Sequence, residues 1–189
     1  NINSEDKKKY FASIGYVKNS AKIGSICGAW SVCFHSGFYM KQDPKKVYNK
    51  IKEGIKIIVK EVKQFDKNIW IRPEISGKQS QFGDLKELIK LSQEIEQVMP
   101  CIDYSHLWAR NSGRAYNTKK EFQQILTDIE KGLGRVALTN MHIHISGIAY
   151  GDKGEKNHLI LKESNFNYKD LIKSLKEFKC KGVAICESP

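Results

Sequence analysis

Several apolar segments of this sequence end in a histidine or an acidic residue. In "CFHSGFY", residues 33–39, a histidine closes an apolar run and is followed by glycine and two aromatic residues, which is an unusual end for a core strand. Each of the other four histidines also lies in, or shortly after, a segment that resembles a strand. Imidazole and carboxylate groups are common ligands of zinc in proteins. The candidate ligands are His35, Glu74, Asp103, His106, His142, His144, His158 and Glu187.

The segment "NMHIHIS" places its two histidines on one side of a strand. Side chains alternate along a strand, so Met141, Ile143 and Ile145 share one face. His142 and His144 share the other face. We expect the apolar face to pack against helices, which directs both imidazoles into the interior of the fold.

Two further segments separate ligands from packing residues by the same reasoning. In "CIDYSH" a spacing of three residues cannot lie on one strand face, so we expect Asp103 to end the strand and His106 to lie in the loop above it. Their different depths predict different roles. In "AICES" Ile185 shares the face of Glu187, and Cys186 takes the opposite face. Cys186 is therefore predicted to pack as an apolar residue and not to bind metal.

Three of the acidic candidates, Glu74, Asp103 and Glu187, would be costly to bury without compensation. Desolvation disfavours the charged form of a carboxylate, and neighbouring carboxylates raise one another's pKa values. Divalent cations remove that cost, and mixed histidine and carboxylate ligands suit zinc, with manganese or iron as alternatives. Each residue taken alone would ordinarily be a structural histidine or a salt-bridge partner. The whole set at the ends of strands favours a metal site.

Apolar periodicity and capping residues predict helices that alternate with five strands. An N-cap followed by proline, Asp43 and Pro44, begins one helix. Thr118 with Glu121 forms a capping box for another. The expected strands are 30–35, 68–74, 99–103, 137–146 and 182–188. The expected helices run from about 4 to 20 and from 44 to about 62, and three more begin after Asp84, Thr118 and Asn167.

This order of elements predicts a parallel sheet covered by helices, because each parallel connection needs a crossover. A doubly wound sheet would usually carry a glycine-rich phosphate loop after its first strand, and this sequence shows none. In a barrel the active groups collect at the carboxyl ends of the strands, as the candidates here do. We therefore expect an α/β fold of the (β/α)8 TIM-barrel class, with about five of the eight units present and residues 1–189 forming a single domain. We also expect the chain to be a piece of a longer protein, without the amino-terminal strands and the final helix.

The composition sets the general class of the protein. With 189 residues and 40% hydrophobic composition, the chain is long and apolar enough for a folded domain. No run approaches the roughly 18 apolar residues of a membrane span. Five cysteines without CxxC spacing favour a reducing cytoplasm. The formal charge of +11 suits a phosphate-rich partner, although lysines that only solvate helix faces explain it equally well.

The motifs together resemble those of endonuclease IV, a metal-dependent family that cuts DNA at abasic sites. "FHSGFY" resembles the family's "FHPG" segment, "CIDYSH" its "CIDTCH" and "NHLILKESNF" its "RHxxLGEGxI" pattern. "RPEISGKQSQFG" resembles the family's glutamate at a glycine-rich strand end, "NMHIHIS" covers the "MH" ligand and "CESP" matches the "ILE" ligand. The resemblance spans essentially the whole chain and implies a (β/α)8 barrel with three zinc ions.

The resemblance also implies how the ligands divide among the metals. Glu74 would bridge the first two metals. The implied ligands are His35 and Glu74 for the first metal, Asp103, His142 and Glu187 for the second, and His106 and His158 for the third.

The chain departs from the family pattern at three places. Lys156 stands where many members have an aspartate ligand of the third metal, and Glu155 is the nearest replacement. His144 is a second candidate for that site, as a direct ligand or as a hydrogen-bonding neighbour. Ser36 replaces the family's usual proline. The family's first histidine ligand is expected just before Asn1.

The activity that the resemblance implies is that of a deoxyribonuclease IV type enzyme of base-excision repair. It would hydrolyse the phosphodiester 5′ to an abasic site in double-stranded DNA through a hydroxide that bridges the metals. Glu74, Asp103 and Glu187 would be the catalytic carboxylates, with two to three zinc ions, or manganese, as cofactors. We expect a cytoplasmic monomer with no membrane partner. Two alternatives stay open: a metal-dependent sugar isomerase or epimerase of the same barrel superfamily, and a catalytically inactive nucleic-acid-binding relative.

Overall fold

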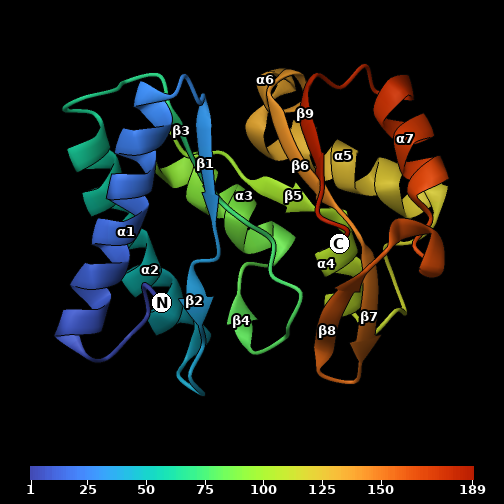
Figure 1. Cartoon of the computed structure of the whole chain (residues 1–189), viewed down its shortest axis with the longest axis horizontal. Helices are drawn as coiled ribbons and strands as arrows, with labels where there is room; N and C mark the ends of the chain where they lie inside the picture. The colour runs from blue at the N-terminus through green and yellow to red at the C-terminus, as the bar shows by residue number, and fades with distance from the viewer. The chain divides into compact units, whose positions relative to one another are not determined.

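A computed structural model describes the whole chain, residues 1–189. It divides into two compact units. Unit 1 comprises Asn1–Glu74 and Ser80–Met99, and unit 2 comprises Ile75–Gln79 and Pro100–Pro189. Helices and strands follow one another throughout both units (Figure 1).

Unit 1 combines three helices with two small sheets. Strand β1 pairs in parallel with β3, and β2 pairs with β4 in the antiparallel sense. In the parallel pair Ser31 lies opposite Trp70 and Phe34 opposite Pro73. The elements of unit 1 are α1 (Lys7–Ile26), β1 (Ser31–Phe34), β2 (Gly37–Phe38), α2 (Pro44–Val62), β3 (Trp70–Pro73), β4 (Gln81–Phe82) and α3 (Leu85–Glu94).

Local capping chemistry starts α2 and α3 where the sequence predicts. The Asp43 carboxylate accepts a hydrogen bond from the Lys46 N–H at 2.9 Å, and Pro44 occupies the first turn. Asp84 caps α3 and forms a reciprocal capping box with Glu87. Each helix then buries one apolar stripe, which in α2 includes Val47, Ile51, Ile55, Ile58 and Val62.

Unit 2 contains a three-stranded parallel sheet in the order β5-β6-β9 and an antiparallel β7–β8 hairpin. Asp103 lies opposite His144 in the β5–β6 pair, and Ile145 lies opposite Cys186 in the β6–β9 pair. The elements of unit 2 are β5 (Cys101–Asp103), α4 (Tyr104–Arg110), α5 (Lys119–Leu133), α6 (Arg135–Thr139), β6 (Met141–Ile145), β7 (Gly147–Gly151), β8 (Gly154–Leu159), the 3-10 turn η1 (Leu161–Glu163), α7 (Tyr168–Glu177) and β9 (Gly182–Cys186).

Helices α5 and α7 of unit 2 also begin at their predicted caps. Thr118 and Glu121 form the capping box of α5, and the Asn167 side chain caps α7 by accepting from the Asp170 N–H. Aromatic contacts then join α5 to its neighbours, with the Phe122 ring 5.8 Å from that of Tyr104 and 6.1 Å from that of Phe166.

The five predicted strands correspond to β1, β3, β5, β6 and β9, so the predicted order of strands and helices is confirmed. Several boundaries were wrong. Helix α1 extends over Lys7–Ile26 because Asp6, rather than a residue near position 4, caps it through the N–H groups of Lys8 and Lys9. Residues 135–139 form α6, so β6 begins at Met141 and not at 137.

Three local expectations need correction. His106 lies in α4 and not in a loop, because the Asp103 carboxylate caps a helix that starts directly after β5. Cys186 is exposed and does not pack in the core. The β2–β4 and β7–β8 pairs were not predicted, because their short and largely polar strands give little apolar signal. No helix in the structure combines the length and the apolar character that crossing a bilayer requires.

Candidate metal centre

His35 and Glu74 follow the two paired strands of unit 1. The Glu74 N–H donates to the Phe34 carbonyl oxygen at 3.0 Å, which continues the β1–β3 pairing by one residue. His35 Nε2 and Glu74 Oε2 are then 3.9 Å apart. The Glu74 side chain is 8% exposed and that of His35 is 42% exposed, so the carboxylate is sheltered and the imidazole is open. Unit 1 therefore offers one imidazole and one carboxylate at the carboxyl ends of parallel strands.

Unit 2 brings Asp103, His144 and Glu187 together at the ends of its three parallel strands, and we call these residues the strand cluster. Pairing of β5 with β6 sets Asp103 opposite His144, and the Glu187 N–H donates to the Ile145 carbonyl oxygen at 2.8 Å. His144 Nδ1 is 3.3 Å from Glu187 Oε1. Each residue offers one ligand atom within 4.8 Å of those of the others. Two carboxylates and one imidazole suit a divalent cation.

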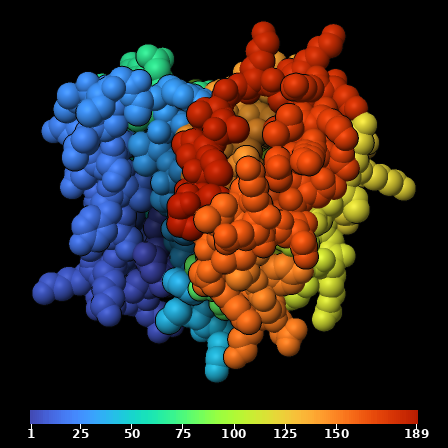
Figure 2. Space-filling view, turned by 45° about the vertical axis from the view of Figure 1, so that its right-hand side comes forward, coloured from blue at the N-terminus to red at the C-terminus, as the bar shows by residue number.

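A second group of unit 2 consists of His106, Glu155 and His158, which we call the hairpin cluster. His106 comes from α4, and the other two residues come from β8. Glu155 Oε2 is 3.6 Å from His106 Nε2, and Glu155 Oε1 is 3.9 Å from His158 Nε2. Figure 2 shows the red carboxyl-terminal segment beside orange atoms of the β7–β8 region. The His158 Nδ1 atom is 3.1 Å from the Glu187 carbonyl oxygen.

Backbone carbonyl groups select the tautomer of both neutral histidines in the hairpin cluster. His106 Nδ1 lies 3.0 Å from the Ile75 carbonyl oxygen, as His158 Nδ1 lies close to that of Glu187. A carbonyl oxygen only accepts, so each Nδ1 carries the hydrogen and each neutral ring keeps its lone pair on Nε2. The two Nε2 atoms are 3.2 Å apart. Two lone pairs at this distance, beside a carboxylate, form a set of donors that a divalent cation could join.

Asp103 joins the two clusters. Its Oδ1 accepts a hydrogen bond from the His106 N–H at 2.7 Å, and its Oδ2 lies 3.2 Å from His106 Nδ1. The residue thus belongs to the strand cluster and orients a ligand of the hairpin cluster. The sequence-based expectation of separate roles for Asp103 and His106 overlooked this contact.

Comparison with known proteins identifies the family. Residues 1–189 match the sequence model of the family described as xylose isomerase-like TIM barrel. The chain belongs to this family. An uncharacterized protein of Methanocaldococcus jannaschii is 43% identical over 189 residues, which cover 100% of this chain and 68% of that protein.

Solved structures agree with the family assignment. A D-tagatose 3-epimerase-like protein superposes with a TM-score of 0.74 at 18% identity, over 98% of this chain and 66% of that one. Endonuclease IV from Thermus thermophilus superposes with a TM-score of 0.72 at 16% identity, over 100% of this chain and 65% of that one. The chain thus spans about two thirds of the length of these proteins. At such identities the likeness establishes the TIM-barrel fold and does not separate a nuclease from an epimerase.

The parallel strands of a TIM barrel carry active groups at their carboxyl ends, and the two histidines of β6 take different depths there. His144 is level with Asp103, whereas His142 lies opposite Cys101, two residues earlier. Their rings are 5.1 Å apart, and both side chains are buried. The family resemblance groups His142 with Asp103 and Glu187. In the structure His144 lies beside these two carboxylates, and His142 lies opposite Cys101.

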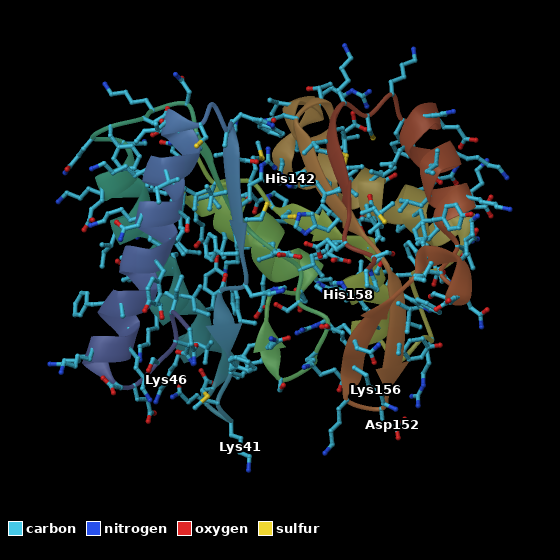
Figure 3. All side chains as sticks on the ribbon, viewed as in Figure 1. Lys41, Lys46, His142, Asp152, Lys156 and His158 are labelled. Carbon is cyan, nitrogen blue, oxygen red and sulfur yellow. The ribbon has the colours of Figure 1, made fainter.

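Position 156 does not contribute to the hairpin cluster. Lys156 is exposed, and its aliphatic chain passes over Gly151. Figure 3 shows Lys156 with Asp152 toward the turn of the hairpin and His158 further along it. The β7–β8 register shifts at this point, with Ala149 opposite Asn157 and Tyr150 opposite Glu155, so Lys156 is an extra residue in β8. This irregularity interrupts the alternation of side chains and lets Glu155 and His158, three residues apart, face the same partner. Glu155, next to the lysine that stands in place of the family's aspartate, is thus the carboxylate that faces His106 and His158.

Other groups around the clusters have structural roles that the motifs did not reveal. Burial raises the pKa of Tyr104 far above its usual range, with a smaller contribution from Cys180, so its hydroxyl stays neutral and cannot exchange protons near neutral pH. Arg110 donates from Nη1 to the carbonyl oxygens of Ser76 and Lys78. Only tertiary contacts reveal these two residues.

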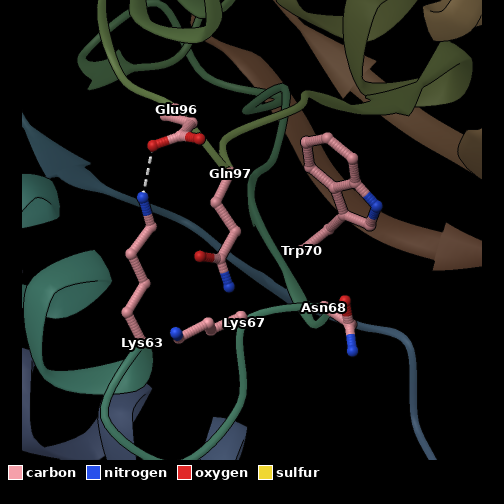
Figure 4. Close-up of a pocket in the computed structure, with 6 residues that line it drawn as sticks. All are labelled: Lys63, Lys67, Asn68, Trp70, Glu96 and Gln97. Atoms are coloured by element: carbon pink, nitrogen blue, oxygen red, sulfur yellow. Dashed lines mark hydrogen bonds and ion pairs between the residues drawn. The ribbon is translucent and has the colours of Figure 1, made fainter.

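A hollow of about 500 Å³ in unit 1 lies away from the predicted ligands of that unit. Lys63, Lys67, Asn68, Trp70, Glu96 and Gln97 line it (Figure 4). It lies at the amino end of β3, whereas Glu74 follows the carboxyl end. Lys63 is already paired with Glu96 there. The hollow therefore contributes nothing to the candidate metal centre.

Proposed function

We propose that this protein is a zinc-dependent endonuclease that hydrolyses the phosphodiester 5′ to an abasic site in double-stranded DNA. The motif resemblance to endonuclease IV supports this activity, and the fold is compatible with it. The strand cluster and the hairpin cluster of unit 2 offer donors of the kind that such an enzyme uses, and unit 1 separately carries the His35–Glu74 pair.

The observation that carries the proposal is the hairpin cluster. A sugar isomerase or epimerase of this family needs strand-end carboxylates and histidines that hold a cation against a vicinal diol. It has no need of a second group in which two imidazole lone pairs and a carboxylate converge. His106 and His158 present their Nε2 atoms at 3.2 Å, with Glu155 facing both. A further cation at this position suits a reaction in which a phosphodiester oxygen leaves with negative charge.

The donor chemistry of both clusters fits divalent cations. Asp103 is fully buried and Glu187 faces His144, so the charge of these two carboxylates would be compensated by a cation in the strand cluster. His106, Glu155 and His158 would hold another in the hairpin cluster. Cations bound at these positions would polarise the phosphate and activate water for its hydrolysis.

The residues of the chain prepare these positions in several ways. The carbonyl oxygens of Ile75 and Glu187 accept from Nδ1 of His106 and His158, so each neutral ring keeps its Nε2 lone pair on the side of Glu155. Asp103 orients His106 through its backbone and its ring. Exposed Lys153 and Lys156 stand on the hairpin that carries His158, and the net charge of +11 favours a polyanionic substrate.

A metal-dependent sugar epimerase is the second candidate. The structural likeness to a D-tagatose 3-epimerase-like protein is as strong as that to endonuclease IV. The strand cluster alone could serve such a reaction, because carboxylates and a histidine can hold a cation against two hydroxyl groups.

Substrate tests on the full-length protein distinguish the candidates. The protein is stripped of metal, reloaded with zinc or manganese, and incubated with a duplex that contains one abasic site, with the undamaged duplex and with D-fructose. We expect a single cut 5′ to the abasic site and no change in the other two substrates. Epimerisation of the sugar without cleavage would overturn the proposal, and so would DNA binding without any cleavage.

A further inference from the structure

The segment 75–79, which follows Glu74 in the sequence, is fastened to the hairpin cluster by its backbone. The Ile75 carbonyl oxygen accepts from His106 Nδ1, and the Gly77 carbonyl oxygen accepts from the Glu155 N–H at 2.9 Å. Lys78 forms an isolated antiparallel bridge with Gly154. Arg110, on the same helix as His106, also holds the segment by donating to the carbonyl oxygens of Ser76 and Lys78. The segment therefore touches α4 and β8, the two elements that supply the cluster.

Gly77 is a point of this segment where an added side chain would meet the ligands themselves. A Cβ atom at position 77 would lie 2.5 Å from Glu155 Oε2, 2.8 Å from Glu155 Cβ and 3.0 Å from His106 Cδ2. These distances are shorter than van der Waals contact allows. The backbone of Gly77 does not have a positive φ, so alanine would fit the local conformation. A glycine is thus needed at position 77 because Glu155 and His106 occupy the space of a side chain, and not because of the backbone conformation.

We infer that Gly77 is a positioning residue that admits the Glu155 carboxylate to His106 and His158. This inference rests on the proposed cation site in the hairpin cluster. A methyl group at position 77 would displace Glu155 and leave two neutral imidazoles, which bind a divalent cation far more weakly than a set that includes a carboxylate.

Gly154 supports the same close approach from the hairpin. Its φ is +96°, and a Cβ there would clash with the Gly77 carbonyl oxygen. The two glycines let the backbones of β8 and segment 75–79 come together, so that Glu155, the residue after Gly154, is held by its N–H as well as by its side chain. The glycines of "SGK", residues 76–78, and "KGE", residues 153–155, are therefore both explained by the close approach of segment 75–79 to β8.

The experiment measures zinc binding rather than activity, in the full-length protein. Zinc affinity is determined by competition with a chromophoric chelator for wild type, Gly77→Ala, Glu155→Ala and the double variant. Gly15→Ala is the matched control, because no atom lies within 4 Å of a Cβ at that position. Thermal unfolding in chelator shows whether each variant is folded.

We expect Gly77→Ala to weaken one zinc site by about 10- to 100-fold, as loss of a supporting group typically does. Adding Gly77→Ala to Glu155→Ala should cause no further loss, because the glycine acts through the glutamate. Gly15→Ala should bind zinc as wild type does. Unchanged zinc affinity in Gly77→Ala, or losses that add in the double variant, would overturn the inference.

The proposed activity can fail separately. If Glu155→Ala and Gly77→Ala weaken the same zinc site but no abasic duplex is cut, the positioning role stands and the nuclease proposal falls. If Glu155→Ala removes no zinc while cleavage persists, the role of Gly77 falls and the nuclease proposal stands.

Discussion

The strand cluster and the hairpin cluster of unit 2 contain similar side chains but are built in different ways. Asp103, His144 and Glu187 stand at equivalent ends of three neighbouring parallel strands. His106 and His158 come from a helix and a hairpin, 52 residues apart in the sequence. Regular strand pairing positions the first cluster, whereas the second depends on contacts between elements that have no common register.

The difference shows how robust each cluster should be. A ligand at the end of a paired strand is held by the backbone hydrogen bonds of the sheet, so a neighbouring substitution moves it little. A ligand of the hairpin cluster depends on single contacts, such as the Ile75 carbonyl oxygen for His106. We therefore expect larger effects on chemistry from losing strand-cluster residues, and larger effects on metal retention from changing the surroundings of the hairpin cluster.

The largest loss is expected for Asp103→Asn, because this residue serves both clusters. Asparagine can still cap α4, but it removes the charge that faces a cation and His106. Single-turnover incision should fall by at least about a thousandfold, roughly 4 kcal/mol of transition-state stabilisation. Circular dichroism should show unchanged helix content. A rate within tenfold of wild type would remove Asp103 from both roles.

The next largest difference is expected between the two histidines of β6. His144→Asn should slow incision by roughly a hundredfold or more, because His144 Nδ1 faces the Glu187 carboxylate. His142→Asn should slow incision by less than about tenfold, because His142 lies opposite Cys101 and not opposite a carboxylate. The two side chains are similarly buried, at 6% and 8% exposed, so each serves as the other's control for stability. Equal losses would show that depth along the strand does not decide the ligand.

The hairpin cluster can be tested at two adjacent residues. Glu155→Ala should release one zinc ion on mild chelation and slow incision by about 10- to 100-fold, whereas Lys156→Ala should keep all the zinc of wild type. Elemental analysis after dialysis measures both. Loss of zinc from Lys156→Ala alone would contradict the orientation of β8 described above.

The smallest effect is expected from the exposed charges of the hairpin. If Lys153 and Lys156 contact phosphates, log K for an abasic duplex should fall with log salt by roughly 0.9 per contact, and each lysine-to-glutamine change should reduce that slope by about one. Lys120→Gln, an exposed lysine on α5, is the control. A slope near zero in wild type would favour a small, uncharged substrate.

The sequence alone determined the order of the elements and the caps that start most helices. Asp84, Thr118 and Asn167 act on N–H groups within three residues of themselves, so their effect does not depend on the rest of the fold. Alternation along β6 likewise placed both of its histidines on one face. The same local reading placed Asp103, His144 and Glu187 in or at the end of predicted strands, which is why all three were recognised as candidates.

Only the tertiary structure decided which candidates meet. Strand register set His144, and not His142, level with Asp103, and no local pattern encodes a register between strands that are far apart in the sequence. The hairpin turned Glu155 toward His106 and Lys156 toward solvent, and the missing side chain of Gly77 made room for that approach. These arrangements result from packing between distant segments, where a single atom at position 77 decides the distance between ligands.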